Sequence, residues 1–121
     1  GPGYRVLEVF EVERKVPVTG AWATPFLPMD RELSWRWVDA TGTRHPHLRQ
    51  DFERKHCVEA TVPPCEIREL FTARSPWEPD VNDSTDAEGW RYGLAWNSST
   101  WDARPGLFDA IRKRRWTKKY G

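Results

Sequence analysis

Tryptophan and arginine are the residues of this chain whose number and spacing are most suited to interact with one another. The 121 residues include eight tryptophans, and the densest aromatic and basic stretch covers residues 89–120. A guanidinium that lies flat on an indole ring contributes roughly 0.5–2 kcal/mol, depending on how dry the contact is. The composition therefore predicts stacked Arg and Trp side chains in place of part of an aliphatic core, and leaves open which rings bind a ligand.

Catalytic and metal-binding motifs are missing from the sequence. It contains no nucleophile elbow, no Gly-rich phosphate loop and no HExxH. The acidic residues 78–88 have the oxygen spacing of a calcium loop but lack its glycine and closing glutamate, so a solvated turn is favoured. The possible zinc ligands match no common spacing, namely His45, His47, His56, Cys57 and Cys65. We expect no enzyme activity, no metal and no cofactor.

The basic run at residues 112–119 could contact nucleic acid, a nuclear import receptor or an anionic membrane. Alternation along a strand would turn Arg112 and Arg114 inward onto aromatic rings. Lys113 and Arg115 would then lie on the opposite side, and the remaining cations are expected to be exposed, namely Lys113, Arg115, Lys118 and Lys119. Because the formal net charge is only +1, nucleic acid is the least favoured partner. An exposed cation near an anionic membrane contributes up to about 1 kcal/mol.

The loop at residues 97–108 carries apolar side chains beside a cation, directly before the basic strand. Trp101, Leu107 and Phe108 accompany Arg104 in this loop. Such a tip is typical of an interfacial membrane contact. The alternative is that these rings fold back onto the core. The sequence predicts a lipid-binding set made of Trp101, Arg104, Leu107, Phe108, Lys113, Arg115 and Lys118.

Alternating and turn-forming residues predict a mainly β fold, a small antiparallel domain with long strands held by Arg–Trp stacking and long loops. Strands are expected over residues 4–16, 35–39, 89–96 and 109–120. Residues 21–34 should be irregular because Pro25 and Pro28 exclude a central strand. Residues 43–75 are expected to form a long excursion between two halves of the β domain, with one short helix within 48–73. At this length we expect a single domain over 4–120, divided into 4–42, the excursion and 76–120. Residues 1–3 are typical of a tag remnant.

The two C-terminal strands should stack against each other on one face. Alternation places Trp90, Tyr92 and Trp96 together on the first strand, and Arg112, Arg114 and Trp116 together on the second. We expect these six residues and Arg14 to form a structural Arg–Trp stack. Trp22, Trp37 and Trp77 are expected in the scaffold, and Trp35 is undecided.

The C-terminal half resembles the dysferlin (DysF) domain. The matching residues are Asp86-Ala-Glu88-Gly89-Trp90-Arg-Tyr92, then Trp96 and Trp101, then Arg112-Lys-Arg-Arg-Trp116. The N-terminal half is similar through Val9-Phe10-Glu11, Trp22, Leu27-Pro-Met-Asp30-Arg31 and Trp37-Val-Asp39-Ala-Thr-Gly42. The resemblance covers about residues 8–42 and 76–118, and the spacing of Trp96 and Trp101 is nearest to the peroxin-type members.

This resemblance implies long antiparallel strands held by Arg–Trp stacks, without catalysis. DysF domains occur in ferlins, in peroxins of the endoplasmic reticulum and in a tectonin-repeat autophagy protein. The family implies a phospholipid or sphingolipid surface as the partner, on the cytosolic face of the endoplasmic reticulum, peroxisome or endolysosome. The alternative is a protein-interaction domain that uses residues 43–75 or the acidic turn 78–88. The isolated domain is expected to be a monomer.

Overall fold

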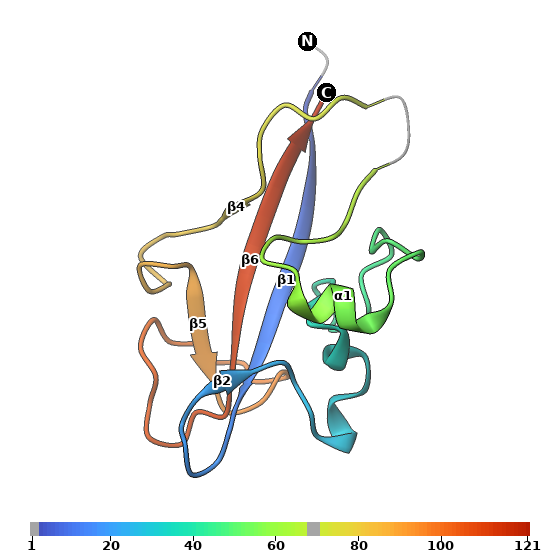
Figure 1. Cartoon of the computed structure of the whole chain (residues 1–121). Helices are drawn as coiled ribbons and strands as arrows, with labels where there is room; N and C mark the ends of the chain where they lie inside the picture. The colour runs from blue at the N-terminus through green and yellow to red at the C-terminus, as the bar shows by residue number, and fades with distance from the viewer. Residues whose placement is uncertain (1–2, 68–70) are drawn as a thin grey trace.

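Two long strands form the axis of the molecule. In the computed structural model, which describes residues 3–67 and 71–121, β1 (Arg5–Lys15) pairs antiparallel with β6 (Ile111–Tyr120). The register joins Arg5 to Tyr120 and Arg14 to Ile111, so the pairing covers nearly all of both strands. The chain termini lie at one end of this ribbon (Figure 1). Residues 16–21 and 94–110 lie at the other end, which we call the distal end.

Four short strands extend the ribbon into a six-stranded antiparallel sheet. β2 (Trp22–Ala23) and β3 (Trp37–Val38) pair with β1, whereas β4 (Glu78–Pro79) and β5 (Trp90–Gly93) pair with β6. The 3-10 helix η1 (Pro28–Trp35) precedes β3, and α1 (Arg54–Glu59) lies within the excursion. The mainly β fold and the short helix within 48–73 are confirmed. The strand expected over 35–39 is shorter than predicted because Trp35 ends η1.

Side-chain alternation gives the β1–β6 ribbon two faces, and each is covered by its own apolar core. The first, called the ladder face, carries the odd residues of β1 and the even residues of β6. Its core comprises Leu7, Val9, Trp37, Leu48, Cys57, Cys65, Ile67, Trp116 and Tyr120. The second, called the back face, carries the even residues of β1 and the odd residues of β6. Its smaller core comprises Val12, Leu33, Val38 and Ile111.

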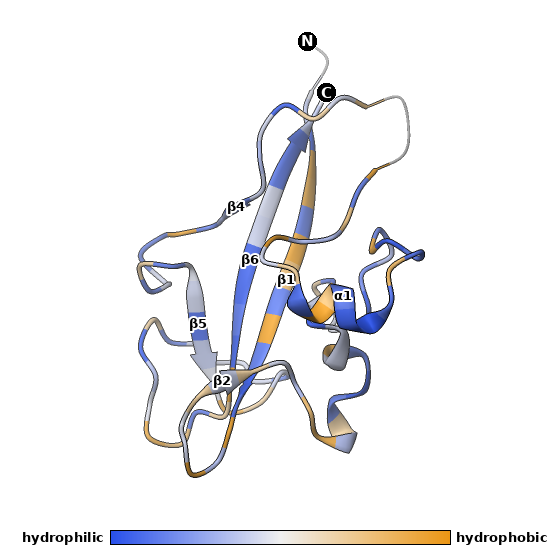
Figure 2. Cartoon of the chain, viewed as in Figure 1, coloured by the Kyte–Doolittle hydropathy of each residue, from blue (hydrophilic) through white to orange (hydrophobic). Residues whose placement is uncertain are grey.

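The excursion, residues 43–75, contributes apolar side chains to the core of the ladder face, because β6 itself has few. β6 is hydrophilic along most of its length, while β1 shows hydrophobic bands (Figure 2). Leu48, Cys57, Cys65 and Ile67 of residues 43–75 are buried against the ladder face. This part of the chain is therefore integral to the fold.

Candidate membrane-contact site and its scaffold

Arginine and tryptophan side chains alternate on the ladder face. The Arg112 Cζ lies 4.9 Å from the ring centroid of Trp22 and 3.9 Å from that of Trp90. The Arg114 Cζ lies 4.4 Å from the Trp90 centroid and 4.8 Å from that of Trp116. We call this series, Trp22–Arg112–Trp90–Arg114–Trp116, the ladder. Both arginines are thus sandwiched between rings, as the alternation of the two C-terminal strands predicts.

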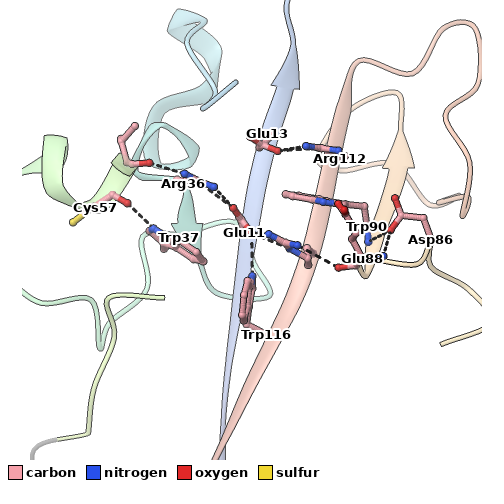
Figure 3. A network of polar contacts seen from close by, with 12 residues as sticks. Glu11, Glu13, Arg36, Trp37, Cys57, Asp86, Glu88, Trp90, Arg112 and Trp116 are labelled. Carbon is pink, nitrogen blue, oxygen red and sulfur yellow. Dashed lines mark hydrogen bonds and ion pairs between the residues drawn. The ribbon is translucent and has the colours of Figure 1, made fainter. Parts of the chain in front are cut away.

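Carboxylates from β1 and a further arginine complete the ladder (Figure 3). Glu11 is fully buried, and its Oε1 accepts hydrogen bonds from Arg114 Nε at 2.9 Å and from Trp116 Nε1 at 3.0 Å. Its Oε2 accepts from Arg36 Nε at 2.8 Å. Arg112 Nε donates to Glu13 at 3.0 Å. The arginines of the ladder are therefore neutralised within the domain, and they serve the scaffold rather than a ligand.

Tyr92 also belongs to the ladder face. Its ring centroid lies 5.6 Å from that of Trp22, and its hydroxyl donates to Asp86 Oδ2 at 2.6 Å. Burial raises the pKa of Tyr92, and the hydrogen bond to Asp86 raises it further. The Asp86 carboxylate also accepts from the backbone N–H groups of Glu88 and Trp90, so much of the acidic turn is bonded internally.

Arg14 was expected in the Arg–Trp stack, and this prediction is wrong. Arg14 is an even residue of β1 and points to the back face, opposite the ladder. There its Nε donates to the buried Asp30 at 2.8 Å. The strand register, rather than the residue type, places it in an ion pair.

Trp96 was also expected in the stack, and it lies on the other side of the sheet. β5 ends at Gly93, so the alternation predicted over 89–96 stops there. The ring of Trp96 packs edge-on against Phe10 and Trp101, with centroid distances of 6.3 and 6.2 Å. Trp96 therefore belongs to the cover of the back face.

Trp101 and Lys113 interact with each other on the back face. The Lys113 Nζ lies 4.0 Å from the Trp101 ring centroid, 5.3 Å from that of Trp96 and 5.8 Å from that of Phe10. The Trp101 Nε1 donates to the Ser98 carbonyl at 2.8 Å. The sequence predicts an exposed Lys113, which is wrong, because Lys113 is half-buried among the rings. Trp101 is half-buried as well, so this ring folds back onto the core, as the alternative for the loop states.

Arg115 and Lys118 lie away from the loop. Arg115, expected to be exposed, is half-buried and forms ion pairs with Glu8 and with Asp80, the latter at 3.0 Å. The Lys118 Nζ lies 5.7 Å from the Trp77 centroid. Lys118 is seven positions beyond Ile111 along β6, which corresponds to about 24 Å in a strand. The seven predicted lipid-binding residues therefore do not form one continuous surface.

Leu107, Phe108 and Arg104 are the predicted lipid-binding residues that the structure leaves exposed at the distal end. The relative exposure is 86% for Leu107 and 81% for Phe108. The loop is closed at its base by two backbone hydrogen bonds between Tyr92 and Asp102, at 2.8 and 2.9 Å. An open groove of about 420 Å³ is lined by Leu107 and Phe108 together with residues 94, 98–100, 102, 106 and 109. The loop thus presents two adjacent apolar side chains on an anchored base.

Both cysteines belong to the core of the ladder face. Cys57 and Cys65 are buried free thiols, and burial raises the pKa of Cys65 to about 12, so its thiol stays neutral near pH 7. Within residues 3–67 and 71–121, His, Cys, Asp and Glu do not gather into a group of three that could hold a metal ion. In the same ranges no helix has the length and apolar character needed to span a bilayer.

No family model matches the chain, and no curated protein matches its sequence. The fold and the exposed loop define a small mainly β domain with an apolar tip on a scaffold of stacked arginines and tryptophans.

Proposed function

We propose that this chain is a non-catalytic membrane-lipid recognition module of the DysF type, which inserts the tip of its distal loop into a bilayer interface. The observation that carries the proposal is the exposure of Leu107 and Phe108, adjacent in sequence and both more than four-fifths accessible. Full burial of a side chain of this size contributes about 1.5–3 kcal/mol. In the free domain the Leu107 and Phe108 side chains stay in water, whereas insertion into a bilayer interface would bury them in an apolar environment.

The surroundings of the tip support this function. Leu94, on the same loop, and Val18, in the β1–β2 turn, are also exposed. The register of β1 with β6 brings this turn and the loop to the same end of the ribbon (Figure 1). Arg104 adds an exposed cation that can meet a head-group phosphate. Because the base of the loop is already hydrogen-bonded, insertion requires little additional ordering of the backbone.

The resemblance to DysF domains supports the same conclusion. Its most specific residues, from Trp90 to Tyr92 and from Arg112 to Trp116, come together in the ladder and its neighbours. We therefore propose a phospholipid or sphingolipid surface as the partner. The corresponding location is the cytosolic face of the endoplasmic reticulum, peroxisome or endolysosome.

Co-sedimentation with vesicles of different head groups tests this function. The variant with Leu107→Asp and Phe108→Asp should bind at least about a hundredfold more weakly, because it loses two apolar contacts. The matched control is Val81→Asp, which adds a carboxylate at an exposed apolar position outside the distal end and should bind normally. Absence of binding to every vesicle, or equal binding by the double variant and the unchanged protein, would exclude the proposal.

A further inference from the structure

A small pocket on the back face is lined by three cationic side chains. It measures about 110 Å³, and its lining includes Phe10, Asp80, Thr85, Arg91, Lys113 and Arg115. Arg91 on β5 pairs in register with Lys113 on β6, so both cations lie on the same face of the sheet. The volume is well below the roughly 300–1,000 Å³ of pockets for drug-sized ligands. The pocket is therefore sized for a small group.

The charges around this pocket are not balanced. Arg115 is held by Glu8 and by Asp80, whose Oδ2 accepts from its Nη1 at 3.0 Å. Arg91 and Lys113, by contrast, have no ion pair or hydrogen bond to a carboxylate in the described part of the chain. This leaves two neighbouring positive charges without an acidic partner.

The environment of Lys113 makes this imbalance unfavourable. Burial lowers the pKa of Lys113, and the charge of Arg91 lowers it further. The rings of Trp96 and Trp101 cover one side of the ammonium but accept no conventional hydrogen bond, whereas an ammonium has three N–H donors. Like charges held close together in a partly dry site are destabilising unless an anion lies between them.

We propose that this pocket binds a single tetrahedral oxyanion, the phosphate group of a free phosphate or of a lipid head group, between Arg91 and Lys113. The planar guanidinium can donate two parallel N–H bonds to phosphate oxygens, and the ammonium contributes a compact charge. Arg115 forms a cationic wall, and its ion pair neutralises the one carboxylate in the lining, Asp80. This site lies on the sheet and does not depend on insertion of the loop.

Titration with inorganic phosphate at constant ionic strength tests the pocket. In ¹H–¹⁵N NMR spectra of the full chain, saturable shifts are expected at the amides of Arg91 and Lys113 and at the indole N–H of Trp101. Arg91→Gln and Lys113→Gln should each weaken phosphate binding by at least about tenfold. The control Lys55→Gln removes an equal charge from an exposed position of α1, outside both proposed sites, and should leave the affinity unchanged.

Two outcomes would overturn this inference. One is the absence of any saturable shift at these amides. The other is an equal loss of affinity in Lys55→Gln and Arg91→Gln, which would indicate general charge attraction. Because Lys113 also packs in the back-face core, Arg91→Gln decides the result if Lys113→Gln unfolds.

Vesicle binding distinguishes the two sources of phosphate. The vesicles contain phosphatidylcholine with phosphatidylinositol 4-phosphate, and the controls contain phosphatidylserine at equal surface charge. If the ligand is a lipid head group, Arg91→Gln loses the preference for the phosphomonoester lipid; if it is free phosphate, Arg91→Gln binds both vesicles like the unchanged protein. Loss of vesicle binding by the loop variant alone concerns the proposed function and leaves the pocket unaffected.

Discussion

Replacing Glu11 by Gln is expected to destabilise the domain by about 3–5 kcal/mol, because two partly buried arginines lose their shared counter-ion. Glu11 is 0% exposed, and the side chains of Arg36 and Arg114 are only 20% and 16% exposed. Gln preserves the shape of the side chain but removes the negative charge. Its NH₂ group also turns a donor toward groups that are themselves donors.

Urea unfolding followed by tryptophan fluorescence measures this effect. With a slope of about 2 kcal/mol per M, the expected loss lowers the midpoint by about 1.5–2.5 M while the slope stays unchanged. The matched control is Glu8→Gln on the opposite face, where the side chains of Glu8 and Arg115 are 38% and 36% exposed. Arg115 keeps Asp80 there, so the control should lose less than about 1 kcal/mol.

Equal shifts of the midpoint in Glu11→Gln and Glu8→Gln would refute the reasoning. Such a result would mean that the stacked rings hold Arg114 and Arg36 without the buried carboxylate. A change of slope instead would indicate an altered unfolded or native ensemble, and the comparison would then be repeated from the unfolding rates.

Two further predictions concern Gly42 and His45. A Cβ at Gly42 would lie 2.2 Å from Trp96 Nε1, so Gly42→Ala should lose about 1–3 kcal/mol more than Gly20→Ala in thermal unfolding. Gly20 also has a positive φ, but only one atom lies within 4 Å of a Cβ built there, at 3.8 Å. Equal losses of stability in the two variants would therefore contradict a clash with Trp96. Burial lowers the pKa of His45, so stability should be lost as the pH falls below about 6.5, where the unfolded chain binds the proton more readily. An NMR titration of His45 with a midpoint at or above that value would contradict this.

Both long strands and the ladder could be predicted from the sequence, because β1 and β6 contain no glycine or proline and the rings and guanidinium groups of the ladder recur at every second position in β5 and β6. Alternation within a strand does not determine the register, that is, which residues of the two strands face each other. The even residues of β1 pair with the odd residues of β6, so Arg14 lies opposite Ile111 and away from Arg112. The same register brings Glu11 beside Arg114, and no pattern within either strand alone indicates that this carboxylate is the shared partner.

The position of Trp101 was harder to predict because it depends on contacts between distant parts of the chain. A Cβ at Gly93 would lie 3.0 Å from the Trp101 ring, so this glycine allows the indole to pack directly on β5. Asp102 then bonds to Tyr92 and turns the chain back. The glycine inside an otherwise alternating strand was the available signal, since such a residue often marks the close approach of another group.

The two central strands of the sheet, β1 and β6, are the first and the last strand in the sequence, so β6 is synthesised last. The Glu13–Arg112 ion pair joins residues 99 positions apart, and closing a flexible loop of that length costs about 4 kcal/mol plus a constant. Until β6 has left the ribosome, Leu7 and Val9 on one face of β1 and Val12 on the other lack the strand that completes their cores. Both cores should therefore close only after β6 has been synthesised, in a late step that depends on pairing between distant parts of the chain.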